Sequence, residues 1–404
     1  MPALAIRAYT ATTALGRGSA AQASALRERR GGLRRNDFGE GAVADACLDT
    51  WIGRVDGLES SPLLADAAQW ECRNNRLAWI ALQQDGLLEI LAELRARYGT
   101  ERIAVVLGTS TASIGATEEA YARLENSGGA VPRFPEDLAR PTVHTPHSLG
   151  GFVQHATGLR GPCITVATAC SSSAKVFAQA ARLIAAGVVD AALVGGVDTL
   201  CGSVLFGFNA LGLVSSQPCR PFDAQRDGLS LGEAGGFAVL EKLERGGERA
   251  ALTLRGYGES SDAHHMSAPH PEGLGARLAM SAALARAGID ASAVGYLNLH
   301  GTATPANDAI EARAVDALFP AGLHASSTKG WTGHTLGAAG IVESVFALIA
   351  LEDGVLPGIL NSHDRDTACG AQIRIDNAQA KIDYAMNNSF GFGGNNCSLV
   401  FGRA

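Results

Sequence analysis

The sequence predicts an α/β fold in which parallel sheets are covered by helices. Strand-like and helix-like segments alternate along the chain, and this alternation is typical of parallel sheets with helices on their faces. A continuous apolar run at 190–194 is typical of a strand that is buried on both sides. Of the 404 residues, 47% are hydrophobic and only 18% are charged, which fits a globular protein with a large core.

The alternation occurs twice. Before a polar stretch at 244–250, the expected strands lie at 3–9, 103–107, 163–167, 190–194 and 235–240, with helices at 19–30, 73–82, 86–98 and 172–186. After it, the expected strands lie at 252–257, 296–299, 386–389 and 398–401, with helices at 273–287, 307–319 and 335–351. We therefore expect two similar halves, 1–249 and 250–404.

Composition excludes several classes of protein. The net charge of −7 argues against nucleic-acid binding. Eight cysteines without a CxxC pair indicate free thiols in a reducing compartment. The start of the chain has no secretory signal pattern, and no apolar stretch reaches the ~18–20 residues of a membrane helix. We therefore expect a soluble cytoplasmic protein that does not bind membranes.

Cys170 is the first candidate catalytic residue. It follows the β-prone run 163–167 and precedes the helix predicted at 172–186, so its thiol lies at a helix N-terminus. Free N–H groups and the helix dipole stabilise an anion there. A cysteine so placed can have its pKa lowered from ~8.5 into the range of ~3.5–7.5. On this stretch alone, a buried structural cysteine remains an alternative.

Three later stretches carry further polar groups at predicted strand ends. His300 follows a buried strand, where ligands of parallel sheets bind. Lys329 and His334 precede a helix that contains Glu343, and a glycine-rich loop at 387–396 carries two aromatic residues. Each stretch is weak evidence by itself. Together, a thiol, two histidines, a lysine and a glycine loop at strand ends predict one shared site.

These residues resemble the β-ketoacyl-acyl carrier protein synthases, the condensing enzymes of fatty-acid and polyketide synthesis. The matching motifs are TACSS at 168–172, PFD at 221–223, RDG at 226–228, HGTATP at 300–305, Lys329, TGHTLGAAG at 332–340 and NSFGFGG at 388–394. The resemblance extends from about residue 4 to residue 401. It implies a thiolase fold, with two duplicated halves in five layers α-β-α-β-α, and a dimer.

The chemistry of condensation assigns a role to each residue of the site. Cys170 would accept the acyl chain, with the backbone N–H groups of Cys170 and, by resemblance, of Phe392 stabilising the oxyanion. Neutral His300 and His334 would stabilise the enolate formed as malonyl thioester loses CO2. Lys329, paired with Glu343, would hold the site together. A zinc ion bound by the thiol and the two histidines is an alternative that would leave the lysine and the glycine loop unexplained.

The resemblance also implies how substrates and partners bind. No metal or cofactor is expected, because both substrates are carried on the phosphopantetheine of acyl carrier protein. The expected substrate-binding residues are Thr302 and Thr304 for the pantetheine arm, and Phe208, Phe390 and Thr111 for the acyl pocket that Phe392 gates. The carrier protein could dock on the arginines between 27 and 35, or on Arg73, Arg76, Arg133 and Arg140.

Some segments differ from housekeeping synthases. RNNR at 73–76, HTPHSLG at 144–150 and FNALG at 208–212 resemble synthases of pigment clusters, such as those that make aryl polyenes. That likeness implies polyunsaturated acyl chains, and either a homodimer or a heterodimer with a chain-length-factor homologue. Two alternatives stay open. A non-catalytic chain-length-factor-like subunit would lack the nucleophile, and a CoA-dependent thiolase would use a second cysteine, for which Cys397 is the candidate.

Overall fold

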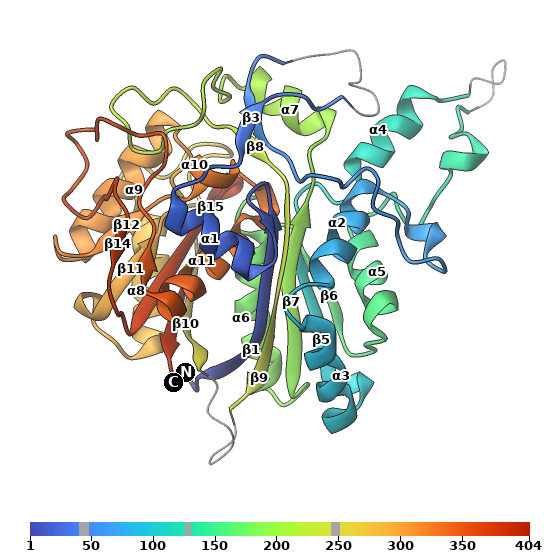
Figure 1. Ribbon diagram of the computed structural model, residues 1–404, viewed down its shortest axis with the longest axis horizontal. Coiled ribbons are helices and arrows are strands. Elements are labelled where there is room, and N and C mark those ends of the chain that lie inside the picture. Colours follow the sequence, from blue (N-terminus) through green and yellow to red (C-terminus); the bar gives the residue numbers. More distant parts are fainter. Residues whose placement is uncertain (40–47, 126–130, 244–250) are drawn as a thin grey trace.

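The computed structural model describes residues 1–39, 48–125, 131–243 and 251–404 (Figure 1). The first half contains the strands β1 (Leu4–Thr13), β5 (Ile103–Gly108), β6 (Cys163–Val166), β7 (Ala191–Asp198) and β9 (Ala234–Lys242). The second half contains β10 (Leu252–Ser261), β11 (Val294–Asn298), β12 (His324–Ser326), β15 (Tyr384–Gly391) and β16 (Asn395–Arg403).

Strand order shows that the two halves have the same topology. The first half is ordered β6-β5-β7-β9-β1, and the second is ordered β12-β11-β15-β16-β10. If the five strands of each half are numbered by their order in the chain, both halves arrange them across the sheet as third, second, fourth, fifth and first. The halves join where β1 pairs with β10 over Leu4–Ile6, which makes one continuous sheet. The predicted boundary between residues 249 and 250 lies outside the described residues and stays a prediction.

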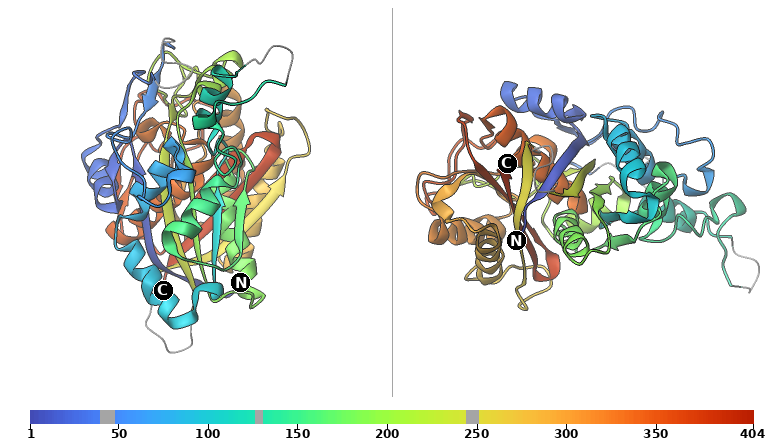
Figure 2. Two further views of the ribbon diagram at one scale, coloured as in Figure 1. Left: turned by 90° about the vertical axis from the view of Figure 1, so that its right-hand side faces the viewer. Right: turned by 90° about the horizontal axis from the view of Figure 1, so that it is seen from below.

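Helices form three layers around and between the two halves of the sheet (Figures 1 and 2). The outer face of the first half is covered by α2 (Arg73–Leu82), α3 (Leu87–Tyr98) and α5 (Ser148–Thr157). The outer face of the second half is covered by α8 (Leu274–Ala287) and α9 (Pro305–Leu318). Between the halves lie α6 (Ser172–Ala185) and α11 (Ala339–Asp353), which contact each other and both halves. The predicted five layers are confirmed.

The remaining elements are short or lie outside these layers. They are β2 (Gly16–Arg17), α1 (Ser19–Glu28), β3 (Leu33–Arg35), β4 (Trp51–Gly53), α4 (Ile114–Ala122), α7 (Gly202–Ala210), β8 (Leu231–Gly232), α10 (Lys329–Thr332), β13 (Val355–Leu356) and β14 (Ala378–Gln379). Among the described residues, no helix has both the length and the apolar character needed to cross a membrane.

The prediction of parallel sheets holds for only part of each half. Within the large sheet, as far as the structure describes it, three adjacent strands of each half are parallel, β6-β5-β7 and β12-β11-β15. The strands β9 and β16 run antiparallel to their neighbours on both sides. Since only the short turn Phe392–Gly394 joins β15 to β16, those two strands have to be antiparallel.

Several predicted element ends differ from the structure, and two of these differences lie close to the candidate site. β7 continues through Gly195 and Gly196 instead of ending there. Glycine is needed in this part of the strand because helix α6 packs closely against it: a Cβ at Gly196 would lie 2.5 Å from the Cβ of Ser173. The helix predicted from residue 335 begins at Ala339. Leu336 has a φ of 56°, which a right-handed helix does not allow, so the turn Leu336–Ala338 precedes α11.

The core helix α11 brings a charge into the centre of the molecule. All residues from 339 to 351 are buried, as in a helix that is surrounded by other layers. Its one charged residue in that buried stretch is Glu343, with 3% of its surface exposed. A charged side chain at this depth requires an ion-pair or hydrogen-bond partner. That partner is a residue of the candidate active site.

Candidate active site

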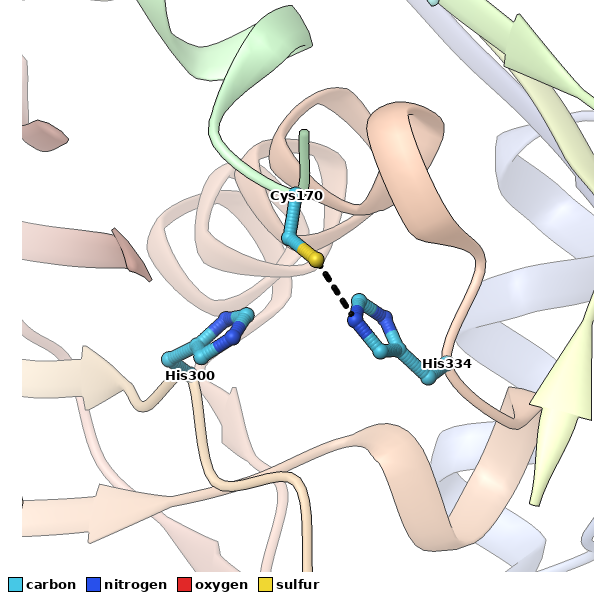
Figure 3. Close-up of side chains that lie close together, drawn as sticks. All are labelled: Cys170, His300 and His334. Atoms are coloured by element: carbon cyan, nitrogen blue, oxygen red, sulfur yellow. Dashed lines mark hydrogen bonds between the residues drawn. The ribbon is translucent and has the colours of Figure 1, made fainter. Parts of the chain in front are cut away.

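Cys170, His300 and His334 converge between the two halves (Figure 3). Cys170 follows β6, His300 follows β11, and His334 follows α10, which itself comes after β12. The thiol sulfur and one ring nitrogen of each histidine all lie within 4.8 Å of one another. His334 Nε2 is 3.0 Å from Cys170 Sγ, and the two imidazole rings are 5.5 Å apart at 85°. The ends of parallel strands from both halves thus form one site.

Cys170 occupies a sharp turn between strand and helix. Ala169 has a φ of 52°, and the backbone N–H of Thr168 donates to Ser172 Oγ at 2.9 Å across the turn. The glycine loop packs directly against it: a Cβ at Gly391 would lie 3.2 Å from the Cys170 backbone nitrogen. The backbone N–H of Phe392 donates to the Cys170 thiol. The turn and the loop therefore bring the N–H groups of Cys170 and Phe392 together.

The expected lowering of the thiol pKa is wrong. Burial raises the pKa of Cys170 to about 12, and its side chain is only 5% exposed. The nearby Lys329 ammonium and the N–H of Phe392 act in the opposite direction but do not outweigh the loss of hydration. Cys170 lies before the helix N-terminus as predicted, but the depth of burial outweighs the helix effect and favours a neutral thiol.

This pKa leads to a direct prediction. Below the pKa of a thiol, the thiolate fraction rises about tenfold for each pH unit. We expect the rate of Cys170 alkylation by iodoacetamide, measured by mass spectrometry of its peptide, to rise through pH 10 without a plateau. The same peptide in denatured protein is the control, and its rate should level off near pH ~8.5. A plateau of the folded protein below pH 8 would contradict a raised pKa.

Both histidines are arranged to donate from Nε2. Lys329 Nζ lies 3.4 Å from His300 Nδ1, and the backbone N–H of Leu336 donates to His334 Nδ1 at 3.3 Å. A neutral imidazole that accepts at Nδ1 carries its proton on Nε2. Burial and the charge of Lys329 lower the pKa of both histidines well below the ordinary value, so both rings are neutral. A zinc ion would need a lone pair on each Nε2, which this arrangement does not offer.

Lys329 connects the buried charge on α11 to His300. Its Nζ donates to Glu343 Oε1 and to the backbone carbonyl of His300. Lys329 is 1% exposed and Glu343 is 3% exposed, so the pair is fully buried. Burial raises the pKa of Glu343 to about 7, against the opposing effect of Lys329. The structure thus brings together these two residues, which the sequence predicted to pair.

Sequence reasoning missed the carboxylates behind His300. Glu311, which is 1% exposed, accepts the backbone N–H of His300 at 2.8 Å and of Gly301 at 2.7 Å. Asp308 lies one turn earlier on α9 and accepts the backbone N–H of Phe222 at 2.8 Å. Burial raises the pKa of Glu311 to about 7. The sequence did contain a signal for them: two acidic residues lie three positions apart on one face of a predicted helix, and acidic side chains are rarely buried without partners.

The predicted substrate-binding residues surround Cys170, with one exception. A cavity of about 350 Å³ is lined by Thr302, Thr304, Phe208, Phe390 and Phe392, together with the thiol and the two histidines. The rings of Phe208 and Phe392 stack at 5.8 Å, and the hydroxyl oxygens of Thr302 and Thr304 are 2.8 Å apart. Thr111 does not line this cavity. It is buried and donates its hydroxyl to Asp198 at 2.7 Å, so its predicted place in the acyl pocket is wrong.

Cys397 does not have the surroundings of a second nucleophile. It lies inside β16 with no exposed surface, and burial raises the pKa of its thiol. It is not among the residues that line the cavity over Cys170. The feature that would have favoured a thiolase is therefore a core residue.

The comparison with known proteins agrees with this geometry. The model of the N-terminal domain of β-ketoacyl synthase matches residues 71–246, and that of the C-terminal domain matches residues 252–363. The chain is 36% identical over 342 residues to 3-oxoacyl-[acyl-carrier-protein] synthase 2 of Vibrio cholerae, covering 81% of this chain and 80% of that protein. It is 38% identical over 340 residues to the enzyme of the same name from Vibrio harveyi, covering 80% of each.

Solved structures show the same fold along the whole chain. The ketosynthase ApeO, in complex with its chain length factor ApeC from Xenorhabdus doucetiae, has a TM-score of 0.88 and 35% identity, covering 100% of this chain and 98% of that one. A β-ketoacyl synthase from Burkholderia phymatum has a TM-score of 0.86 and 28% identity, covering 100% of both. These matches confirm the predicted family and the thiolase fold. The chain belongs to the β-ketoacyl synthase family, condensing enzymes of the acyltransferase class.

Proposed function

We propose that this β-ketoacyl synthase carries its acyl chain on Cys170 and generates its carbon nucleophile with His300 and His334. The observation that carries this proposal is the convergence of one thiol and two neutral Nε2–H donors within 4.8 Å. A thiol supports acyl transfer, and paired donors support an enolate. The two half-reactions can therefore take place at one point of the cavity.

Acyl transfer uses the turn at Cys170. The sulfur attacks the carrier-bound thioester, and the oxyanion accepts the N–H groups of Cys170 and Phe392. Collapse of this intermediate breaks the bond to the pantetheine sulfur, which leaves with the proton that Cys170 loses. The Nε2–H of His334, 3.0 Å from Sγ, stabilises negative charge on the sulfur during the attack. This donor compensates for the burial that raises the thiol pKa.

Decarboxylation uses the two histidines. The thioester carbonyl oxygen of the malonyl group accepts both Nε2–H groups. As the bond to the carboxylate breaks, CO2 leaves and its electron pair forms an enolate whose oxygen both donors stabilise. The enolate carbon then attacks the acyl carbonyl on Cys170, a C–C bond forms, and the thiolate leaves. Neutral rings suffice for each step, which agrees with their lowered pKa values.

The substrates supply the only prosthetic group that this mechanism needs. We propose that both arrive on the phosphopantetheine of acyl carrier protein, that Thr302 and Thr304 bind its amides, and that Phe208 and Phe392 contact the acyl chain. All four residues line the cavity. Polyunsaturated chains of the aryl polyene type are the acyl class that we propose, because planar chains suit contact with two stacked aromatic rings.

A homologous subunit is the second partner that we propose. The ketosynthase ApeO, with which this chain shares 35% identity, is in complex with its chain length factor. In this chain β6 is an edge strand whose residues are half-buried, so it offers backbone groups to a second sheet.

Seven cysteines of the described chain are free thiols, which supports a reducing cytoplasm as the location.

The site where the carrier protein docks is still a choice between arginine clusters. Arg27, Arg34 and Arg35 form ion pairs with Asp353, Asp56 and Asp49, respectively. Arg73 is held by Glu233 and Glu59, and Arg76 by Glu71. Arg27 and Arg35 are more exposed than Arg73 and Arg76, so they present charge to an acidic partner more readily, and Arg133 of the second set is exposed as well. If the carrier protein docks on one cluster, reversing the charges of that cluster should raise KM for carrier-bound thioesters and leave KM for free thioesters unchanged. Equal effects on both substrates would reject that cluster.

Incubation with acyl-carrier and malonyl-carrier substrates tests the proposed function. We expect CO2 and β-ketoacyl product in equal amounts, either from the chain alone or from the chain with its co-purified subunit. A non-catalytic chain-length-factor-like protein would not form an acyl thioester on Cys170. A thiolase would act on CoA substrates without releasing CO2. Either result would reject the proposal.

A further inference from the structure

We propose that Asp198 is a positioning residue that keeps the proton of His334 on Nε2. Its importance for catalysis rests on the proposed role of His334 as a donor. The proposal itself concerns a hydrogen-bonding arrangement that can be observed without any turnover. Neither the sequence motifs nor the cavity over Cys170 includes Asp198.

Asp198 lies at the C-terminal end of β7 and has no exposed surface. Its two carboxylate oxygens accept six donors, which are Thr109 Oγ1 (2.5 Å), Ser110 N (2.9 Å), Ser110 Oγ (2.7 Å), Thr111 N (3.0 Å), Thr111 Oγ1 (2.7 Å) and Gly337 N (2.6 Å). Five of these come from the loop after β5 in the first half. The sixth comes from the second half, three residues after His334. Asp198 therefore fixes the His334 segment to the first half.

The bond to Gly337 determines the conformation of its neighbour. A Cβ at Gly337 would lie 2.6 Å from Asp198 Oδ2, so only glycine permits this close approach. Leu336, immediately before it, has a φ of 56°, a left-handed conformation that is strained for a residue with a Cβ. In this conformation the N–H of Leu336 donates to His334 Nδ1. The charge-assisted bond from Gly337 to Asp198 offsets the strain in Leu336.

The position of the Leu336 N–H determines which ring nitrogen of His334 carries the proton. With Nδ1 occupied as an acceptor, the neutral ring carries its proton on Nε2, which faces Cys170 Sγ (Figure 3). Without Asp198, Leu336 can relax to a negative φ and turn its N–H away. The proton is then free to move to Nδ1, and Nε2 presents a lone pair to the substrate. A lone pair repels the enolate oxygen that Nε2–H would stabilise.

Asp198→Asn tests the proposal because it keeps the shape of the side chain and removes its charge. In ¹⁵N-histidine NMR spectra we expect His334, assigned by its absence in His334→Asn, to change from one tautomer with Nε2–H to a mixture in which the Nδ1–H tautomer dominates. We expect CO2 release from acylated enzyme to fall at least about tenfold, since loss of such a donor costs up to ~10³-fold. Acylation of Cys170 should fall less than CO2 release does, by at most the about tenfold expected when His334 no longer donates to the sulfur.

Three further variants separate positioning from a general structural role. Thr109→Val removes one donor to Asp198, leaves Gly337 in place, and should leave the tautomer unchanged. Gly337→Ala should reproduce the tautomer mixture with Asp198 intact, and it replaces Asp198→Asn if that variant does not fold. Adding Leu336→Gly to Asp198→Asn should restore part of the Nε2–H signal, because glycine adopts a positive φ without strain.

Two results would overturn the proposal. One is an Nε2–H signal of His334 that stays complete in both Asp198→Asn and Gly337→Ala. The other is a parallel fall of acylation and CO2 release with an unchanged tautomer, which would indicate a general loss of structure. If the condensing function itself were wrong, the tautomer change would still be seen, and only the effect on CO2 release would be lost.

Discussion

We expect Cys170→Ala to abolish acyl-enzyme formation and condensation. Among the described residues, no other thiol lines the cavity with the two histidines, so a folded alanine variant has no sulfur there to accept the acyl chain. Mass spectrometry of the protein after incubation with acyl-carrier substrate should show no acyl adduct. CO2 release from malonyl-carrier substrate should continue in this variant, because the enolate needs only the donors of His300 and His334. The two half-reactions would thereby be separated.

Cys397→Ala is the matched control for this prediction. Both cysteines are buried and both have a raised thiol pKa, but Cys397 lies inside β16 and away from the cavity. We expect Cys397→Ala to retain condensation and to lose on the order of 1 kcal/mol of stability through the lost packing. Condensation that survives in Cys170→Ala, or disappears in Cys397→Ala, would show that the nucleophile has been misassigned.

The residues of the candidate site could be predicted from the sequence because each lies in a short motif that follows a strand. Cys170, His300 and His334 are far apart in the chain, yet the layered fold brings the ends of β6, β11 and β12 to one place. The pairing of Lys329 with Glu343 could be predicted as well, since a charge in an apolar helix needs a partner. The family resemblance then supplied a role for each residue.

Burial and strand direction could not be predicted in the same way. The thiol pKa of Cys170 depends on how many layers cover it, a property of the whole fold, and the helix N-terminus alone gave the wrong direction. Thr111 was assigned to the acyl pocket from the resemblance, and its hydrogen-bond partner, Asp198, is 87 residues away in the chain, so the local sequence does not reveal that partner. The antiparallel course of β9 and β16 likewise depends on connections that an apolar strand pattern does not reveal.

Replacing either active-site histidine should remove most of the decarboxylation. We expect His300→Ala and His334→Ala each to lower CO2 release by about 10²–10³-fold, the effect of losing one donor to a developing oxyanion. Single-turnover release of labelled CO2 from malonyl-carrier substrate, with Cys170 already acylated, measures this step alone. In the proposed mechanism both neutral rings donate from Nε2 to the same oxygen, so the double variant should lose no more than the product of the two single effects.

The two variants should differ in acyl transfer. His334 Nε2 lies 3.0 Å from Cys170 Sγ, whereas His300 has no hydrogen bond to the thiol among the described residues. His334→Ala should therefore slow acylation of Cys170 by about tenfold, the effect of one charge-assisted hydrogen bond, and His300→Ala should leave it nearly unchanged. His324→Ala is the control, because this buried histidine contacts the carbonyl of Pro357 and lies outside the cavity. Equal effects of both active-site variants on acylation would mean that His334 does not stabilise the sulfur. Only the Phe392 loop and Lys329 would then oppose the effect of burial on the pKa of the Cys170 thiol.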